Sequence, residues 1–398
     1  IDYQLSFGES VSGLTAADFS NAGTATGCTF TPLDAQGNPT SAYVSGGGYV
    51  TVRITNCSAP GTLLPRLLAD SVADTAGNVG PTAFVNAFDT ITLDRITPTA
   101  TIALQTTSDS GRLNTDNLTN AASPVFDVTF DETIDIQTVG AGDFSNVGTA
   151  SCSVASATTG VGVIVTLSCS SDGTIVLRLA TNGISDQAGN FAAETDSPMI
   201  TRDATAPTLT LAAVTASPTS STSLVFTLSG NEPLNCATIS TVSADFTRTN
   251  ISSLGPITGS GTTTCSIPAT SSIGYASSGS SSLTRAATFS VADDAGNAQT
   301  AISSGSPASI TVDRAAPSVS SFASATSSPT NSTSIDYTLS FGESVTGLAT
   351  GDFANVGTAT GCTFTPSGSG SSYTVTVTTC STTGTLQPRL AANAVRDR

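Results

Sequence analysis

Hydrophobic residues alternate with Ser, Thr and other polar residues in short runs along the whole chain. The alternation is clearest in residues 1–7, 50–54, 335–341 and 373–377. A period of two is typical of a strand that buries one face, whereas helical periodicity is rare in this sequence. Strands with one buried face are expected to form two sheets packed face to face. The pattern therefore predicts an all-β chain built from β-sandwiches.

One sequence module occurs four times. Residues 1–32 and 335–366 align without a gap and differ at only 7 positions, and two more diverged copies begin near Val125 and Leu224. Three landmarks recur in order: a Glu after the first long strand, an Asp-Phe pair, and an Asp four positions before a linker Pro. The spacing of about 110 residues is close to that of an immunoglobulin-like sandwich. We therefore expect tandem immunoglobulin-like modules at residues 1–94, 95–203, 204–313 and 314–398.

About seven strands are expected in each module. In the second module they are placed at Ala100–Leu104, Val125–Phe130, after Asp143, from Cys152, at 163–169, at 174–179 and just before Asp203. An odd number of traverses puts the two chain ends of a module at opposite poles, which predicts an elongated rod. The first copy begins at its second strand and the fourth ends before its last. We therefore expect the sequence to be a segment of a longer array.

The composition excludes several kinds of chemistry. The 398 residues include 12 basic side chains, all arginine, against 29 acidic ones, and there is no His or Trp. A Ser-His-Asp triad, a Schiff-base lysine and a histidine zinc site are therefore absent from this sequence. A net charge of −17 without a basic cluster argues against nucleic-acid binding. No apolar run is long enough to insert into a membrane. We expect a protein that is not an enzyme.

The eight cysteines fall two to a module. In the second and fourth modules the two cysteines are separated by 17 and 18 residues and bracket an expected hairpin. Pairing within modules predicts the disulfides Cys28–Cys57, Cys152–Cys169, Cys236–Cys265 and Cys362–Cys380. Metal thiolates or redox centres are the less favoured alternative, because no C-x-x-C pair and no His are present. Structural disulfides indicate an extracellular protein.

The repeated acidic residues are expected to meet where the chain enters each module. Calcium prefers six to eight oxygen ligands, which carboxylates and carbonyls at such a junction can supply. The sequence therefore predicts calcium sites at three linkers. Their candidate ligands are Asp94, Glu132, Asp143, Asp186 and Asn190; then Asp203, Glu232, Asp245, Asp293 and Asn297; then Asp313, Glu343, Asp352 and Asp397. The alternative is that these residues only form solvated turns, because Asp in D-x-A-G-N is a common turn former.

Three motifs occur in a fixed order: S-F-x-E-x-V-x-G-L-x-x-x-D-F early in the module, D-x-A-G-N late, and D-x-x-x-P at the linker. In this combination the chain resembles bacterial immunoglobulin-like repeats, which build the stalks of secreted adhesins and biofilm-associated surface proteins. The resemblance covers essentially the whole chain. It implies a β-sandwich fold, export, a tandem array and frequently bound calcium, and it implies no catalytic activity.

These observations favour a structural role outside the cell. We expect a disulfide-stapled stalk or fibre, on the bacterial surface or secreted, whose partners are neighbouring modules of the same longer chain. One alternative is a subunit of an extracellular filament or sheath, which would pack against identical chains through exposed sheet edges. A glycan-binding module is the second alternative, and it is disfavoured because carbohydrate platforms usually need exposed aromatic side chains.

Overall fold

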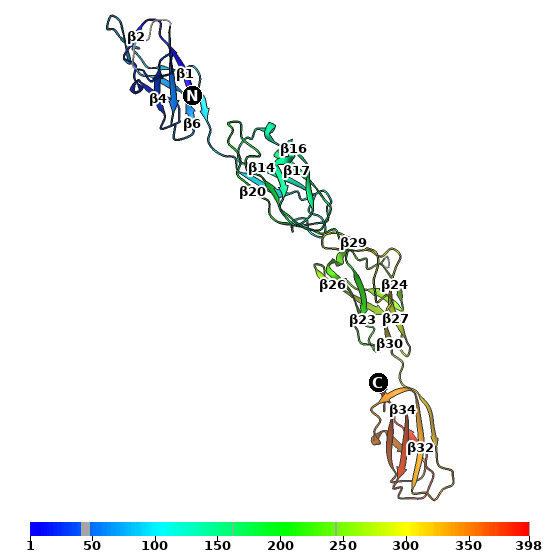
Figure 1. The fold of residues 1–398 in the computed structure, drawn as a ribbon. Coiled ribbons are helices and arrows are strands. Elements are labelled where there is room, and N and C mark those ends of the chain that lie inside the picture. The colour runs from blue at the N-terminus through cyan, green and yellow to red at the C-terminus, as the bar shows by residue number, and fades with distance from the viewer. Residues whose placement is uncertain (41–47, 161, 243–244, 398) are drawn as a thin grey trace. The chain divides into compact units, whose positions relative to one another are not determined.

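The computed structural model describes residues 1–40, 48–160, 162–242 and 245–397. The chain forms two compact units, one made of residues 1–205 with 294–297 and the other of residues 206–293 with 298–398. The described residues form short β-sheets, and their only helices are single 3₁₀ turns (Figure 1). None of these helices has the length and apolar character needed to cross a membrane. The all-β fold class is confirmed.

The second module shows the sandwich most clearly. Its strands are β12 (Ala100–Leu104), β13 (Leu118–Thr119), β14 (Val125–Phe130), β15 (Phe144–Asn146), β16 (Cys152–Gly160), β17 (Gly162–Cys169), β18 (Gly173–Ile175), β19 (Leu177–Leu179), β20 (Thr195–Asp196) and β21 (Ile200–Arg202). One sheet has the order β12-β14-β17-β16, and β13-β21-β18 and β15-β19-β20 form the opposite layer. Alternate residues of both layers, among them Phe126, Val165 and Leu177, are completely buried in one core. The alternation in the sequence therefore identified the buried faces.

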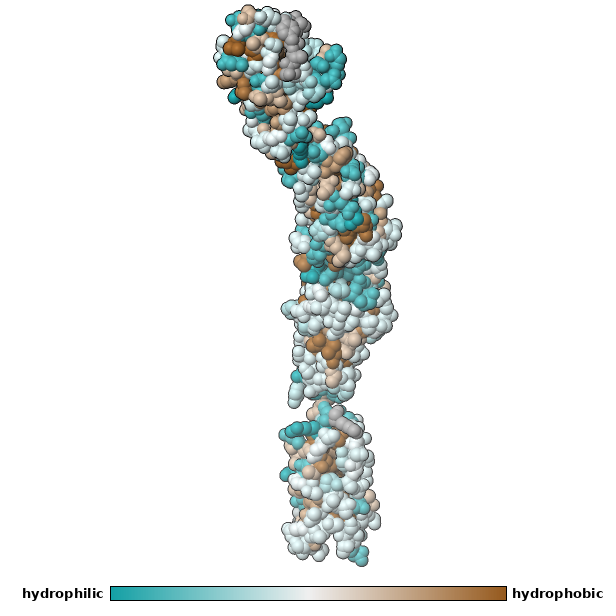
Figure 2. Space-filling model, turned by 60° about the vertical axis from the view of Figure 1, so that its left-hand side comes forward, coloured by the Kyte–Doolittle hydropathy of each residue, from teal (hydrophilic) through white to brown (hydrophobic). Residues whose placement is uncertain are grey.

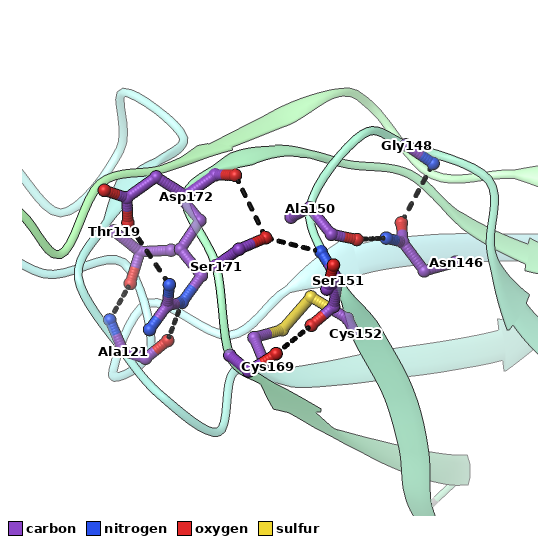
Figure 3. The surroundings of a disulfide bond; sticks show 12 residues. Thr119, Ala121, Asn146, Gly148, Ala150, Ser151, Cys152, Cys169, Ser171 and Asp172 are labelled. Atoms are coloured by element: carbon purple, nitrogen blue, oxygen red, sulfur yellow. Dashed lines mark hydrogen bonds and ion pairs between the residues drawn. A yellow bond between two sulfur atoms is a disulfide. The ribbon is translucent and has the colours of Figure 1, made fainter.

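One predicted strand of the second module is divided. The segment 174–179 forms two strands, because β18 pairs with β21 and β19 pairs with β15. The chain changes sheets at Val176, whose N–H donates to the Asn146 side-chain oxygen at 2.9 Å. Asn146 also donates to the Ala150 carbonyl at 2.7 Å and accepts from the Gly148 N–H at 3.0 Å (Figure 3). This side chain fixes the corner at which the two short strands separate.

The Asn146 corner recurs in the first and fourth modules. Asn21 and Asn355 make the corresponding bonds to Ala25 and Ala359. Each asparagine belongs to an N-x-G-T-A sequence. Glycine is required there because a Cβ on Gly148 would lie 2.1 Å from the Thr174 carbonyl oxygen. The sequence therefore carries a repeated signal for this corner, although the strand pattern alone did not reveal it.

The chain enters and leaves the second module at opposite ends. Ala100 of β12 pairs with Phe130, so the entry lies at the end of β14 that precedes Glu132. At the far end of β17, Cys169 pairs directly with Cys152. The exit lies at that far end, where the Ala204 N–H after β21 donates to the Asp172 side chain at 2.7 Å. This module therefore has the polarity that the strand count predicted.

The first module has eleven strands: β1 (Asp2–Ser6), β2 (Val11–Ser12), β3 (Phe19–Asn21), β4 (Thr29–Leu33), β5 (Tyr49–Thr55), β6 (Gly61–Leu63), β7 (Pro65–Leu67), β8 (Val72–Asp74), β9 (Val79–Gly80), β10 (Val85–Asn86) and β11 (Ile91–Leu93) within the described residues. Their sheets have the orders β1-β5-β4, β10-β7-β3, β2-β8-β9 and β11-β6. Val50, Val52 and Ile54 of β5 are buried as expected, whereas Ile1 is 45% exposed. The first residue of the predicted inward face therefore lies outside the core.

The fourth module and all of the third except residues 204–205 and 294–297 belong to the second unit. The third contains β22 (Leu209–Ala213), β23 (Ser223–Asn235), β24 (Phe246–Thr249), β25 (Ile251–Leu254), β26 (Thr262–Ser271), β27 (Ser278–Arg285), β28 (Val291–Asp293), β29 (Ala298–Gln299) and β30 (Ala308–Asp313). The fourth contains β31 (Val319–Ser324), β32 (Ser334–Thr346), β33 (Phe353–Asn355), β34 (Thr363–Thr378), β35 (Pro388–Leu390) and β36 (Arg396–Asp397). Separate hydrophobic cores lie in residues 209–312 and 322–395. The division of the chain into four modules remains a prediction, and these separate cores are consistent with it.

The four disulfides pair the cysteines as predicted. They join Cys28–Cys57, Cys152–Cys169, Cys236–Cys265 and Cys362–Cys380, and no described cysteine is free. The Cys152–Cys169 bond closes the open end of the β16–β17 hairpin (Figure 3). Cys362 and Cys380 flank β34 with their Cα atoms 4.0 Å apart, so β34 folds back on itself. Each bond staples two neighbouring segments of one module.

Candidate metal centre

Three carboxylates meet where the chain enters the second module. Asp94 follows β11, Glu132 follows β14, and Asp186 forms an isolated β-bridge with Ile134. One oxygen from each of the three side chains lies within 4.8 Å of the others. Asp186 is buried, and Asp94 and Glu132 are half-buried. The topology therefore brings together three of the five residues predicted for this site.

Asp186 is held by the turn that it begins. Its Oδ1 accepts the N–H groups of Ala188 at 2.8 Å and Asn190 at 2.9 Å, and its Oδ2 accepts the Asn190 side-chain amide at 2.8 Å. Asp74 and Asn78 form the same turn in the first module. The turn interpretation of D-x-A-G-N is thus correct for its local geometry. A carboxylate has about four lone-pair positions, so Asp186 retains acceptor capacity beyond these three bonds.

The electrostatics of the three acids differ. The pKa of Glu132 is raised, first by burial and then by the negative charges of Asp94, Asp186 and Asp131. Its Oε1 is buried and has no hydrogen-bond partner among the described residues. The pKa of Asp186 is lowered, mainly by the Asn190 side-chain amide. A proton or a cation beside Glu132 would relieve the repulsion, and oxygen donors of this type suit Ca²⁺.

The second unit contains an equivalent set at the entry of the fourth module. Asp313 ends β30, Glu343 lies in β32 and Asp397 lies in β36, with one oxygen of each within 4.8 Å of the others. These residues line a cavity of about 500 Å³ together with Thr219 and Arg396. Burial raises the pKa of Glu343 most, followed by the charges of Asp397 and Asp313. The same electrostatic arrangement therefore occurs twice.

The middle set is divided between the two units. Asp203 belongs to the first unit, whereas Glu232 and Asp293 belong to the second. Within the second unit Glu232 lies in β23 and the buried Asp293 lies in β28, opposite Leu234 of β23. Asn297, which is part of the first unit, donates its side-chain amide to the Asp203 carbonyl at 2.9 Å.

Three predicted ligands have a different local role. Asp143 and Asp352 accept the backbone N–H groups of Gly140 and Ala349, each at 2.7 Å, and so cap their own 3₁₀ turns. Asp245 is buried and accepts from the Ser240 and Ser290 N–H groups. None of the three joins a carboxylate cluster in the described part of the chain. The Asp of the Asp-Phe pair therefore holds a turn, and it does not lie in the carboxylate cluster in which we expected it.

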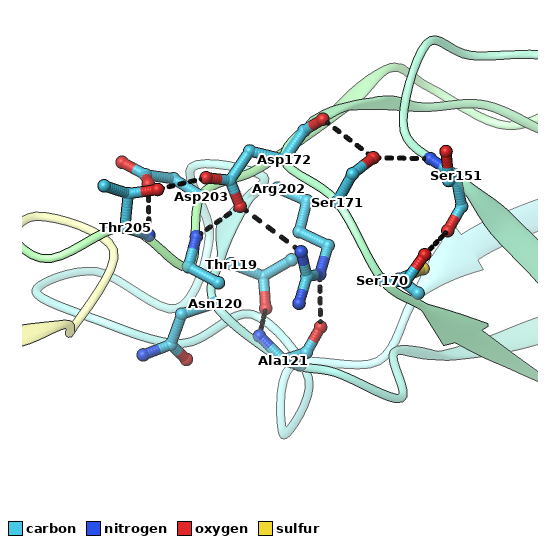
Figure 4. A network of polar contacts seen from close by, with 12 residues as sticks. Thr119, Asn120, Ala121, Ser151, Ser170, Ser171, Asp172, Arg202, Asp203 and Thr205 are labelled. Carbon is cyan, nitrogen blue, oxygen red and sulfur yellow. Dashed lines mark hydrogen bonds and ion pairs between the residues drawn. The ribbon is translucent and has the colours of Figure 1, made fainter.

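The linker arginines were missed by the sequence analysis. Arg202 is only 6% exposed, donates to the Ala121 carbonyl at 3.0 Å and contacts Asp172 at 3.3 Å (Figure 4). Asp172 also accepts from the Thr205 hydroxyl and the Ala204 N–H, and the Thr205 hydroxyl is the main cause of its lowered pKa. Arg95 and Arg314 likewise donate to backbone carbonyls, those of Cys57 and Ile273, in the module that precedes each linker. The available signal was an Arg adjacent to each linker Asp.

Comparison with known proteins identifies the fold of the second module. Residues 96–201 match the family model of the bacterial Ig-like domain. Among solved structures, the chain is similar to FdeC, an Escherichia coli adhesin, with 14% identity over 75% of this chain and 96% of that chain, and a TM-score of 0.38. It is also similar to invasin, a bacterial integrin-binding protein, with 16% identity over 74% and 57% and a TM-score of 0.28. No curated protein matches the sequence.

Proposed function

Because residues 96–201 match the bacterial Ig-like domain and the sequence repeats this module, we propose that the chain is the extracellular structural region of a bacterial surface adhesin or fibre. The observation that carries this proposal is the repetition of one disulfide-bearing sandwich along the sequence. Disulfides form and persist in oxidising compartments, which favours a surface or secreted location. The role is mechanical and not enzymatic: the modules supply length and resistance to unfolding.

The polarity of the second module supports a stalk. Its entry and exit lie at opposite ends, so a tandem array of such modules advances with each copy and forms an elongated rod. Negative-stain microscopy and small-angle scattering of the full chain test this proposal. We expect isolated, thin particles whose maximum dimension is close to the summed length of four sandwiches. Compact particles would contradict it.

A filament or sheath subunit is the second candidate. It is favoured by a surface with few charges, since little repulsion then opposes lateral packing. Figure 2 shows one face of the molecule, on which residues of intermediate hydropathy predominate. Bundled or helical polymers in the same micrographs would support the filament and overturn the isolated stalk.

The carboxylate clusters support a second part of the proposal, that the chain binds calcium. Asp94, Glu132 and Asp186 would hold a Ca²⁺ ion at the entry of the second module, and Asp313, Glu343 and Asp397 would do so at the entry of the fourth. The ion would supply the positive charge that offsets the repulsion raising the pKa of Glu132 and Glu343. Each linker Asp would then be tied to the module that follows it.

Calcium should therefore stiffen the linkers. We expect the maximum dimension of the chain to increase in millimolar CaCl₂ and to decrease in EDTA. A chain with Glu132→Gln and Glu343→Gln should not respond, whereas Glu9→Gln, at the same repeat position in the first module, is the matched control. An identical response of all three proteins would contradict calcium at these sites and would leave the stalk proposal unaffected.

A further inference from the structure

The connection between the first two long strands is longer in the second module than in the third and fourth. It comprises residues 105–124 between β12 and β14, whereas residues 214–222 connect β22 to β23 and residues 325–333 connect β31 to β32. The two short connections contain no acidic residue, and the long one contains Asp109 and Asp116. The additional chain therefore brings two carboxylates that the third and fourth modules lack at this place.

The strand pairing at this connection does not require the two carboxylates. In the second module β13 pairs in parallel with β21, the last strand before the linker. In the third module Thr219, within the short connection, forms a parallel bridge with Val312 of β30, which is the corresponding last strand. The same kind of pairing thus forms with and without Asp109 and Asp116, so these two side chains need another explanation.

Asp109 is a buried carboxylate with an unused oxygen. The residue is only 7% exposed, and its Oδ2 accepts the Asn117 N–H at 3.2 Å. Its Oδ1 is buried and has no hydrogen-bond partner in the described part of the chain. Burying a carboxylate oxygen without a partner costs the desolvation of that group, so the arrangement calls for a proton or a cation beside Oδ1.

Asp116 supplies a second carboxylate at the same place. It is exposed, and its Oδ1 accepts the Leu118 N–H at 3.2 Å. Burial raises the pKa of Asp109 most, and the charge of Asp116 and direct contact between the two carboxyl groups raise it further. Two charged carboxylates in contact repel each other, and a divalent cation between them replaces that repulsion by attraction. Because Asp116 is exposed, a cation can reach the pair from solvent.

The one basic residue of the connection is paired with another acid. Arg112 donates to both carboxylate oxygens of Asp294, at 2.8 and 3.2 Å, and Asp294 belongs to the same unit. No ion pair between Arg112 and either Asp109 or Asp116 occurs among the described residues. The positive charge that would offset the two carboxylates is therefore expected from outside the chain.

We propose that Asp109 and Asp116 hold a Ca²⁺ ion within residues 105–120, at a site separate from the carboxylate clusters at the linkers. The Asp109 Oδ1 and the Asp116 carboxylate are its anionic ligands. Water and main-chain carbonyls of this irregular segment complete the six to eight oxygens that Ca²⁺ prefers. Mg²⁺ fits less well, because it demands near-ideal octahedral geometry and gives up its water reluctantly.

An ion at this site braces the exit of the module. β13 begins two residues after Asp116, and it carries the last strand and the linker. The Asn117 carbonyl accepts the Thr201 N–H at 2.8 Å, and the Thr119 carbonyl accepts the Asp203 N–H at 2.9 Å. Joining Asp116 to the buried Asp109 through the ion therefore restrains the segment on which β21 and the linker Asp are paired.

Hydrogen exchange of the full chain with and without calcium tests this site. In about 10 mM CaCl₂, ten times the weakest dissociation constant expected of an extracellular module, binding should slow exchange in peptides from residues 105–120 about tenfold. Asp109→Asn and Asp116→Asn should each abolish this slowing. Asp127→Asn is the matched control: it removes one charge from an exposed aspartate of β14, keeps an oxygen for the Gln105 amide, and should respond as the parent does.

Two comparisons separate this site from a structural role and from calcium at the linkers. In EDTA, Asp109→Asn should exchange no faster than the parent, because it removes a buried charge and keeps an acceptor for the Asn117 N–H. The chain with Glu132→Gln and Glu343→Gln should keep the calcium effect at residues 105–120. No slowing in the parent, slowing that persists in Asp109→Asn, or its loss in the double glutamine variant would overturn the proposal. None of these results alters the linker test, which measures the length of the chain.

Discussion

Removal of the Cys152–Cys169 disulfide should destabilise the second module alone. The bond closes a loop of 17 residues between directly paired positions of β16 and β17. In the chain-entropy treatment a loop of this length corresponds to ~3 kcal/mol of stabilisation. Because each ~1.4 kcal/mol is a factor of ten, the double variant Cys152→Ala/Cys169→Ala should unfold this module about 100-fold more often.

Hydrogen exchange followed by mass spectrometry measures this change module by module in the full chain. Amides of β14, β17 and β19 should exchange about 100-fold faster at their slowest sites. Peptides from residues 209–312 should be unaffected. The matched control, Cys28→Ala/Cys57→Ala, should change the first module and leave the second unchanged. Loss of protection in all modules, or a change below about threefold in the second, would refute the reasoning that each staple acts within its own module.

Three further perturbations probe the core, the corner and the carboxylates. Phe126→Ala should cost the second module about 3–5 kcal/mol, because Phe126 is fully buried in its core, and hydrogen exchange would detect it. Asn146→Ala should cost about 1–3 kcal/mol by leaving partners of the corner unsatisfied, measured in the same way; no loss would show that water replaces the side chain. Glu132→Gln should stabilise the calcium-free chain at pH 7. The pKa of Glu132 is raised on folding, so the folded protein loses stability as the pH rises through that pKa and the side chain becomes charged. The gain should vanish below the ordinary pKa of Glu, and a loss at pH 7 without calcium would contradict the repulsion.

Alternation and repetition predicted most of the fold. Strands such as β14 and β17 bury every second residue, so their inward faces could be read from the sequence. Cysteines at equivalent places in two modules identified the hairpins that they close. The division of 174–179 into two strands could not be read in this way, because its apolar residues face one core in both strands and the sheet change depends on the distant Asn146.

The candidate site was predicted in part, for a related reason. Glu132 and Asp186 meet because the strands that precede them, β14 and β19, end at the same pole, which the strand order predicts. Whether a carboxylate points into the cluster or back to its own backbone depends on local turn geometry. Asp143 accepts the N–H of Gly140, three residues earlier, and strand order does not distinguish it from Asp186. Arg202 was overlooked because the strand alternation says nothing about linker residues, although an Arg adjoins each linker Asp.

Calcium titration of the full chain by isothermal calorimetry tests the central claim most directly. The account predicts saturable binding with a dissociation constant of about 0.1–1 mM, the range of extracellular modules. Binding should fall when Glu132→Gln and Glu343→Gln are combined and should be unchanged in Glu9→Gln. No saturable heat at millimolar calcium, or the same loss in Glu9→Gln, would contradict calcium-braced linkers.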